Sequence, residues 1–309
     1  MDTTTPDLIA IGETMVLIAP RDATPLADAE DIRLSIGGAE SNVAAHVAAL
    51  GHHAAWVSAL GDDVLGHRVH RAIAAHGVDT RWVSFDPDAP TGVYFKDPGR
   101  GVLYYRAGSA ASRMGPASLS AVPLEEARIV HVSGITPALS ADCAAMVDAV
   151  IARVAGGGGT LSFDVNHRAA LWPASVAAPV LLDLANRSDI VFVGRDEAEN
   201  LWGTRTAEDV RDLISTPGRL VVKDGDVGAT EFSAEGVEFV PAIPTEVVEA
   251  VGAGDAFAAG YLAGLLAGES PRECLQRGHR QAHLVLQSTD DVVGIGTTAR
   301  ADAVTEPQH

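Results

Sequence analysis

The stretch with the clearest potential for chemistry is a glycine-rich turn followed at once by a carboxylate. It consists of Gly252, Ala253, Gly254 and Asp255, and an apolar helical run follows it. Unobstructed N–H groups at the start of a helix favour a phosphate or a developing oxyanion. A carboxylate would repel a phosphate, but beside one it can accept the proton of an attacking hydroxyl. The stretch therefore indicates phosphoryl transfer with Asp255 as base; the alternative is a structural turn whose aspartate only caps the helix dipole.

The elements that must position this turn follow an alternating pattern of strands and helices. Buried strands are predicted at 8–12, 55–60, 129–133, 161–165, 190–193 and 220–223. Helical spacing between them includes a helix after Gly38, for which we expect Ser41 to be the N-cap, and a helix at 141–155 that four glycines end. Such alternation predicts one doubly wound α/β domain with helices on both faces of a mostly parallel sheet.

Residues 91–106 break this alternation. TGVYFKD and GVLYYRAG alternate polar with apolar or aromatic residues around a DPGRG turn, which is typical of a β-hairpin with one wet face. Together with more exposed strands near 16–36, the hairpin predicts a small β-layer outside the main sheet. We therefore expect a single domain over 1–309, with lid strands inserted at about 13–36 and 91–107.

Candidate ligand-binding residues follow the predicted strands, because ligands bind beyond the carboxyl ends of strands in open α/β sheets. They are Gly37, Gly38, Asn42, Asp164, Asn166, Arg168, Glu197, Asp224 and Gly225. Glycine N–H groups, carboxylates and a carboxamide suit phosphate oxygens, Mg²⁺ and a hydroxyl acceptor. The chain lacks a Walker loop, a dinucleotide fingerprint after its first strand and a Gly-x-Ser-x-Gly elbow, which disfavours hydride transfer and hydrolysis.

Two arginines stand at positions expected to face a ligand. Arg106 ends the aromatic hairpin strand, and Arg168 follows the strand FDVNHR. A planar guanidinium can hold a carboxylate through two hydrogen bonds, so the pair favours an anionic substrate. The alternative is that both make surface ion pairs.

Composition excludes several classes of partner. The chain carries 22 basic and 41 acidic residues, a formal net charge of −19, and no concentrated basic run, so we expect neither nucleic acid nor a membrane surface as partner. Two cysteines and an N-terminus without a basic, signal-like region predict a reducing cytoplasm. His279 and His283 share a helix face, but no carboxylate cluster accompanies them, so a metal site there is not favoured.

Two motifs resemble those of the PfkB, or ribokinase-like, carbohydrate kinase family. They are IGGAESNVA at 36–44 and VGAGDAF at 251–257, and the likeness spans essentially the full chain. The resemblance implies a three-layer α/β/α sandwich with a β-lid, and ATP and Mg²⁺ as cofactors. It implies an anion hole made by Gly252, Ala253 and Gly254, with Asp255 as base, sugar contacts from Gly38 and Asn42, Mg²⁺ held by Glu197 through water, and ATP phosphates flanked by Lys223, Gly225, Gly228, Gly252 and Gly254.

Within the family the chain is most similar to 2-keto-3-deoxygluconate kinases, in APTGVYFKD, YYRAGSAASR and FDVNHRAALW. This likeness implies substrate contacts from Tyr94, Tyr104, Arg106 and Arg168, with the arginines binding the sugar carboxylate. Two other functions stay open. One is a fructokinase or another neutral-sugar kinase of the same fold, and the other is a non-catalytic sugar-sensing binder.

Three departures from the family pattern and one surface feature complete the expectations. Glu249 and Ala250 replace the usual Asp and Thr, which leaves a monovalent-cation site open. Gly194 replaces the Asn of the Asn-x-x-Glu motif that Glu197 completes, so how Mg²⁺ is held stays open, and His167 stands where Leu is usual. The lid hairpin is expected to pair with its copy in a homo-oligomer.

Overall fold

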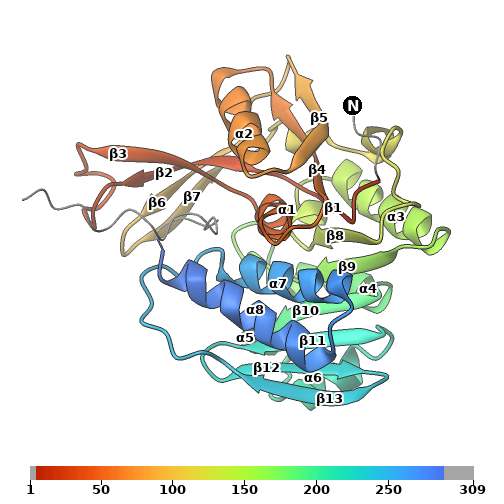
Figure 1. Cartoon of the computed structure of the whole chain (residues 1–309). Helices are drawn as coiled ribbons and strands as arrows, with labels where there is room; N and C mark the ends of the chain where they lie inside the picture. Colours follow the sequence, from red (N-terminus) through yellow and green to blue (C-terminus); the bar gives the residue numbers. More distant parts are fainter. Residues whose placement is uncertain (1–4, 289–309) are drawn as a thin grey trace, which may run out of the picture.

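The computed structural model describes residues 5–288, and its centre is a nine-stranded sheet (Figure 1). The strand order is β13-β12-β11-β10-β9-β8-β1-β4-β5. All neighbours pair in parallel except β11–β12 and β12–β13. The strands are β1 (Leu8–Ile11), β4 (Ala54–Gly61), β5 (Asp79–Asp86), β8 (Ile129–Ser133), β9 (Thr160–Asp164), β10 (Ile190–Gly194), β11 (Arg219–Asp224), β12 (Gly228–Ser233) and β13 (Gly236–Pro241).

Helices cover both faces of this sheet. One face carries α1 (Ala39–Ala49), α2 (Val64–Ala75), α7 (Ala253–Ala267) and α8 (Pro271–Leu286). The other carries α3 (Ala141–Ala155), α4 (Ala174–Asn186), α5 (Arg195–Trp202) and α6 (Ala207–Leu213). Short 3₁₀ turns lie at η1 (Ala111–Arg113), η2 (Pro116–Leu119) and η3 (Thr136–Ala138). The predicted three-layer architecture is thereby confirmed.

Strand β10 is a continuous apolar run whose side chains belong to two hydrophobic clusters, one on each face of the sheet. Side chains alternate across a strand, so Val191 and Val193 join the cluster around α3 and α4, whereas Phe192 joins the cluster around α7. Its ring meets that of Tyr261 edge to face, with centroids 5.3 Å apart. Burial on both faces fixes the strand between two helical layers and leaves only its carboxyl end free for polar groups.

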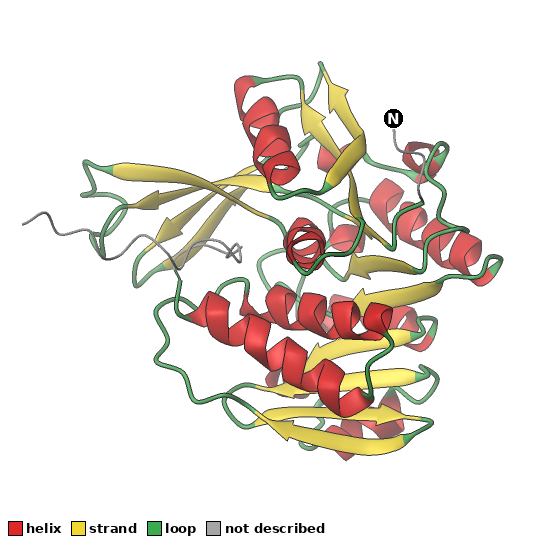
Figure 2. Cartoon of the chain, in the orientation of Figure 1, coloured by secondary structure: helices red, strands yellow, loops and turns green. Residues whose placement is uncertain are grey.

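A second, four-stranded sheet projects from the main one and consists of strands and loops alone (Figures 1 and 2). Its order is β3-β2-β6-β7, from β2 (Met15–Pro20), β3 (Ile32–Gly37), β6 (Val93–Asp97) and β7 (Gly101–Tyr105). We call this sheet the lid. Its strands lie within one residue of the segments predicted from sequence, about 13–36 and 91–107. The assignment of the whole range 1–309 to one domain stays a prediction, because it includes residues 1–4 and 289–309, which lie outside the described part.

The start of α1 differs from the sequence-based expectation. Ser41 lies inside the helix, and Gly38 is the N-cap, without a side-chain cap. A Cβ atom on Gly38 would lie 2.4 Å from the carbonyl oxygen of Glu13, so only glycine permits the close approach to the segment after β1. The Ser41 hydroxyl instead donates to the Gly38 carbonyl oxygen (3.0 Å) and accepts from Thr14 Oγ1 (2.6 Å). The N-cap prediction was therefore wrong.

Within residues 5–288, no helix combines the length and the apolar character that crossing a bilayer requires.

Candidate active site

A cavity of about 670 Å³ lies between the lid and the carboxyl ends of the central strands. Most residues predicted for the site line it, although they come from distant parts of the chain. They are Gly38, Asn42, Tyr94, Tyr104, Arg106, Arg168, Glu197, Lys223, Gly252, Gly254 and Asp255. The fold therefore brings the glycine turn, the aromatic hairpin and both arginines to one place.

The turn before α7 offers N–H groups to this cavity. Gly252 is the N-cap of α7 with φ +84°, a left-handed conformation that favours glycine, and no side chain caps the helix there. The N–H groups in the first turn of a helix have no acceptor within the helix. Those of Gly254 and Asp255 are in that turn, beside the cavity, at the positive end of the α7 dipole, which is a position that favours an anion.

Asp255 meets a partner from the other end of the chain. Asn42, on α1, donates from Nδ2 to Asp255 Oδ2 at 2.9 Å. Burial raises the pKa of Asp255 to about 7, against the hydrogen bond from Asn42 and the charge of Arg168, which both lower it. A carboxylate with a pKa near neutrality is a better proton acceptor than an ordinary aspartate. Asn42 was expected to contact a sugar, and its role as a partner of Asp255 was not foreseen.

The pH dependence of turnover should therefore follow Asp255. As pH falls below about 7, Asp255 takes up a proton and can no longer act as base, so kcat/KM should decrease on the acidic side. Because the bond from Asn42 lowers this pKa, Asn42→Ala should move the acidic limb to higher pH. The measurement is a pH–rate profile for both proteins.

A matched variant separates Asp255 from its neighbour Glu197, whose pKa is also raised to about 7. In Glu197→Gln the acidic limb should remain. Two results would contradict the assignment to Asp255. One is an acidic limb at the same pH in Asn42→Ala as in the unaltered enzyme, and the other is loss of the acidic limb in Glu197→Gln.

Three charged groups meet where β9, β11 and α5 come together. Lys223 Nζ lies 2.9 Å from Asp164 Oδ2. Glu197 accepts hydrogen bonds from the backbone N–H groups of His167 and Gly194. Burial, and then the negative charge of Asp164, raise the pKa of Glu197. Burial lowers the pKa of Lys223, but the carboxylates of Asp164, Glu197 and Asp255 outweigh it, and the net shift is upward.

This cluster fits Mg²⁺. The carboxylates of Asp164 and Glu197 form a hard-oxygen site in which the charge of Asp164 raises the pKa of Glu197, and Mg²⁺ is usually bound by one or two carboxylates together with substrate phosphates. Sequence reasoning gave this role to Glu197 alone. Asp164 was noted at the end of its strand, but only the fold shows that it lies beside Glu197 and Lys223. The backbone N–H of Gly194 donates a hydrogen bond to Glu197, so the glycine that replaces the usual asparagine still contacts this carboxylate.

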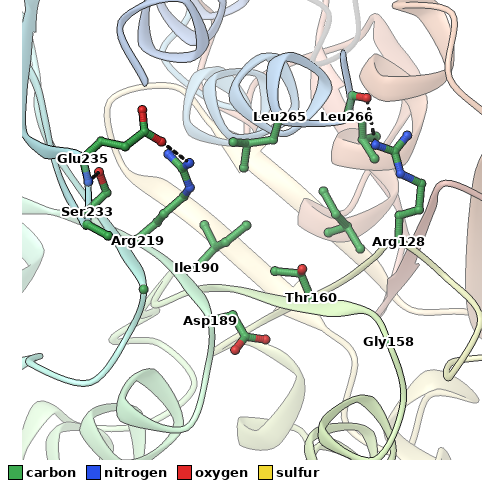
Figure 3. A pocket seen from close by; sticks show the side chains of 13 residues that line it. Arg128, Gly158, Thr160, Asp189, Ile190, Arg219, Ser233, Glu235, Leu265 and Leu266 are labelled. Atoms are coloured by element: carbon green, nitrogen blue, oxygen red, sulfur yellow. Dashed lines mark hydrogen bonds and ion pairs between the residues drawn. The ribbon is translucent and has the colours of Figure 1, made fainter. Parts of the chain in front are cut away.

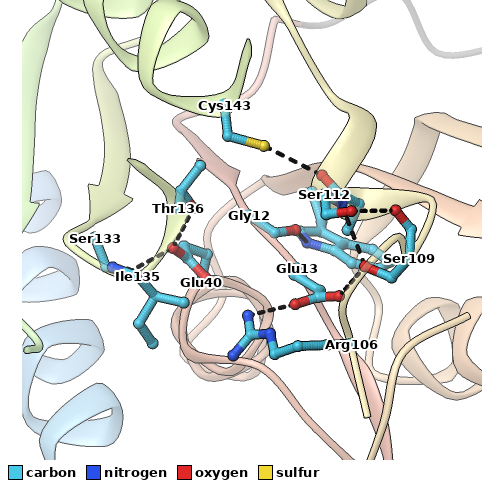
Figure 4. A network of polar contacts seen from close by, with 12 residues as sticks. Gly12, Glu13, Glu40, Arg106, Ser109, Ser112, Ser133, Ile135, Thr136 and Cys143 are labelled. Carbon is cyan, nitrogen blue, oxygen red and sulfur yellow. Dashed lines mark hydrogen bonds and ion pairs between the residues drawn. The ribbon is translucent and has the colours of Figure 1, made fainter. Parts of the chain in front are cut away.

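Arg106 and Arg168 both line the cavity, but they differ in burial and in the partners of their side chains. Arg106 is 8% exposed and makes an ion pair with Glu13, which is 3% exposed (Figure 4). Ser109 donates to the other oxygen of Glu13 at 2.6 Å. The Arg106 guanidinium also lies over the Tyr104 ring, 5.7 Å from its centroid. Arg168 is exposed. The alternative of a surface ion pair is thus wrong for Arg106, whose ion pair is buried.

Two tyrosines extend this wall of the cavity. Tyr94 on β6 and Tyr104 on β7 are cross-strand partners, and their rings stack with centroids 5.8 Å apart. Their side chains share the face of the lid that meets the cavity. Aromatic faces beside hydrogen-bonding groups are typical of small-ligand sites.

Glu40 fixes the helix that carries Asn42. This buried carboxyl accepts hydrogen bonds from Ser133 Oγ (2.7 Å) and Thr136 Oγ1 (3.0 Å), which tie α1 to the end of β8 (Figure 4). Burial raises its pKa. A Cβ atom on Gly12 would lie 2.2 Å from the Glu40 carboxyl carbon, so glycine there leaves room for the group.

Four predicted residues do not line the cavity: Ala253, Asp224, Gly225 and Gly228. Gly225 is in the turn between β11 and β12, and Gly228 begins β12. A Cβ atom on Gly228 would lie 2.4 Å from the carbonyl oxygen of Val240, so packing against β13 is sufficient to require glycine. The nucleotide contacts assigned to Gly225 and Gly228 stay predictions.

A second cavity, of about 510 Å³, lies at the amino ends of the central strands (Figure 3). Its lining includes the first residues of four strands, which are Ile129, Thr160, Ile190 and Arg219. Arg219 is engaged there with Glu231 and Glu235. None of the residues predicted for chemistry lies in it.

In the described part of the chain, no group of three or more His, Cys, Asp or Glu side chains is arranged to hold a metal ion. His279 is buried, and its Nε2 lies 3.0 Å from the carbonyl oxygen of Val240.

Comparisons with known proteins agree with this geometry. A family model described as "pfkB family carbohydrate kinase" matches residues 5–295. A 2-dehydro-3-deoxygluconokinase of Bacillus subtilis (strain 168) is 34% identical over 302 residues, covering 94% of this chain and 93% of the relative. A 2-dehydro-3-deoxygalactonokinase of Haloferax volcanii is 33% identical over 291 residues, covering 91% of each. The crystal structure of a PfkB protein from Polaromonas sp. JS666 has a TM-score of 0.86 at 35% identity, covering 92% of this chain and 96% of that one. The chain belongs to the pfkB family of carbohydrate kinases.

Proposed function

We propose that this sugar kinase transfers phosphate from ATP to the terminal hydroxyl of 2-keto-3-deoxygluconate, giving the 6-phosphate. The observation that carries the proposal is the presence of Arg106 and Arg168 in the same cavity as Asp255. A sugar acid needs cationic partners for its carboxylate, whereas a neutral sugar does not. Relatives that are named for phosphorylating 2-keto-3-deoxy sugar acids support the same substrate class.

The residues divide the reaction between them. Asp255 accepts the proton of the sugar hydroxyl, and the oxygen attacks the terminal phosphorus of ATP as the bond to the leaving ADP breaks. The turn at Gly252, Ala253 and Gly254 binds the oxygens of the phosphate in transfer through the N–H groups of its glycines, which line the cavity. Mg²⁺, held through Asp164 and Glu197, would neutralise phosphate charge. Lys223, beside Gly254, adds a positive charge on the side where we place the nucleotide. Gly225 and Gly228 are also assigned to the nucleotide side in this proposal.

The lid completes the site. Tyr94 and Tyr104 would pack on the sugar, and Gly38 would allow it to approach the start of α1. The lid also leaves large apolar side chains exposed, among them Ile32 (50%), Leu103 (48%) and Tyr105 (64%). These favour pairing of two lids in a homo-oligomer, which light scattering on the purified protein would test.

Two other functions compete with this proposal. The ion pair between Arg106 and Glu13 favours the first of them, a neutral-sugar kinase, because it already neutralises one of the two arginines. The second is a sugar-sensing binder without catalysis, and Asp255 and Glu197 in one cavity speak against it.

A coupled assay for ADP tests the proposal, with the keto-acid, fructose, ribose and adenosine as acceptors. We expect kcat/KM for the keto-acid to exceed that for each neutral acceptor by about 10²-fold, the value of one or two hydrogen bonds to a charged group. Preference for fructose would support the neutral-sugar kinase instead. Absence of ATP consumption with all four acceptors would support the binder.

A further inference from the structure

One lysine of the lid faces the cavity. Lys96 lies two residues after Tyr94 on β6, so both side chains are on the same face of the lid, and both line the cavity. Their cross-strand neighbours Val102 and Tyr104 line it as well. The side chain of Lys96 is only 14% exposed. Lysine side chains are rarely buried unless they are paired with an opposite charge.

The partner of Lys96 belongs to the segment that leads into the glycine turn. Lys96 Nζ lies 3.2 Å from Glu249 Oε2, and the other oxygen of Glu249 accepts a hydrogen bond from the backbone N–H of Val251 at 3.3 Å. The Glu249 carboxylate thus joins the lid to the residue that precedes Gly252. Burial raises the pKa of Glu249, but the ammonium of Lys96 outweighs it and holds that pKa below its usual value.

The same segment is held from its other side by α8. The backbone N–H groups of Val248 (2.8 Å) and Glu249 (3.3 Å) both donate to the carbonyl oxygen of Leu286, the last residue of α8. Residues 248–251 therefore lie between a fixed point on the helical layer and a charged contact on the lid. The side-chain contact between Lys96 and Glu249 connects this segment to the lid.

We propose that Lys96 and Glu249 are positioning residues that couple the lid to the anion-binding turn. The contact from Lys96 orients the Glu249 carboxylate, which holds the N–H of Val251 and thereby places the turn at Gly252, Ala253 and Gly254. Neither side chain needs to touch the transferred phosphate. The inference rests on the proposed role of the turn in phosphate transfer, and it names the residues through which the lid acts on that turn.

This coupling predicts a change in kcat without a matching change in the binding of the acceptor. Misplacing catalytic N–H groups lowers the rate of the chemical step, because their effect depends on alignment with the transferring phosphate. Binding of the acceptor, which depends on the tyrosines and arginines, should change little. A partly exposed ion pair contributes little to stability, so the loss should appear in kcat and not in the unfolding temperature.

The test is a double-mutant cycle of Lys96→Met and Glu249→Gln, assayed with whichever acceptor the unaltered enzyme uses best. Glutamine at position 249 can still accept from the N–H of Val251, so this variant removes only the charge. We expect each single variant to lower kcat about tenfold, with KM values within about threefold, and the double variant to be no slower than the slower single variant. Lys96→Arg keeps the charge and should retain turnover within about threefold.

Controls make a failure of the inference distinct from a failure of the proposed function. The unaltered enzyme first establishes that an acceptor is phosphorylated. Arg272→Met and Glu238→Gln remove a comparable ion pair on α8 and β13 that does not line the cavity, and should leave kcat unchanged.

Full turnover in Glu249→Gln, with a loss in Lys96→Met alone, would overturn the inference and indicate that Lys96 acts on the substrate directly. Losses that multiply in the double variant would overturn it as well, as would unchanged kcat in all variants. Thermal unfolding of each variant shows whether a loss of kcat comes from a loss of fold.

Discussion

Replacing Asp255 by asparagine is expected to lower kcat by at least about 10²-fold, with only a modest change in the KM of the acceptor. Asparagine has the same shape, and its amide oxygen can still accept the hydrogen bond from Asn42 that the structure shows at 2.9 Å. It cannot take up a proton, however, so the hydroxyl must lose its proton to water instead. Steady-state kinetics with saturating ATP measure the effect.

A second readout makes this result specific to the base. Since the pKa of Asp255 is raised to about 7, its removal should also flatten the acidic limb of the pH–rate profile. Asp148→Asn, at a half-exposed carboxylate on α3 that pairs with Arg187, is the matched control and should keep full turnover. Near-normal kcat in Asp255→Asn would refute the assignment of the base.

The second large effect is expected at Arg106, and the structure changes how it must be measured. Arg106→Ala alone would leave Glu13 as a nearly inaccessible carboxylate without its cation, which destabilises proteins by about 3–5 kcal/mol. Any loss of activity would then mix folding with binding. The informative variant is Arg106→Gln combined with Glu13→Gln, because it removes both charges and keeps polar groups of similar size at both positions.

For this double variant we expect kcat/KM to fall about 10²-fold with the keto-acid and by less than about threefold with fructose, since only the keto-acid presents a carboxylate to the guanidinium. Urea unfolding establishes that the variant is folded, and should show Arg106→Ala to be the less stable protein. Equal losses with both acceptors would mean that Arg106 shapes the cavity without binding a carboxylate.

The elements of this fold with strong local signals could be predicted from sequence. The glycine turn and Asp255 are adjacent in the chain, so the chemistry they suggest depends on no other part of the fold. The helix at 141–155 was predicted with its observed bounds, because its apolar spacing is regular and glycines follow it. The two strands of the lid hairpin were found from their alternation of polar and apolar residues.

Two elements were missed for identifiable reasons. Strand β5, at the edge of the main sheet, has no fully buried residue and several polar ones, so its sequence lacks an apolar run. Helix α6 has seven residues, too few for a periodic pattern, although the capping box of Thr206 and Asp209 at its start was a usable signal.

Contacts between distant segments could not be predicted. Asn42 and Asp255 are 213 residues apart, and Ser109 and Glu13 are 96 apart, so no spacing pattern reports either bond. Glu13 received no role from the sequence because a single glutamate after a strand has no distinguishing neighbour. Its burial beside Arg106 follows only from the way in which the lid folds onto the first strand.

A competition reaction tests the central claim most directly. Equal concentrations of 2-keto-3-deoxygluconate and fructose are incubated with the enzyme and a limiting amount of ATP, and the phosphorylated products are resolved by mass spectrometry and phosphorus NMR. The proposed function predicts that nearly all of the phosphate is found on the terminal oxygen of the keto-acid. Phosphate mainly on fructose, or ATP left unconsumed, would contradict it.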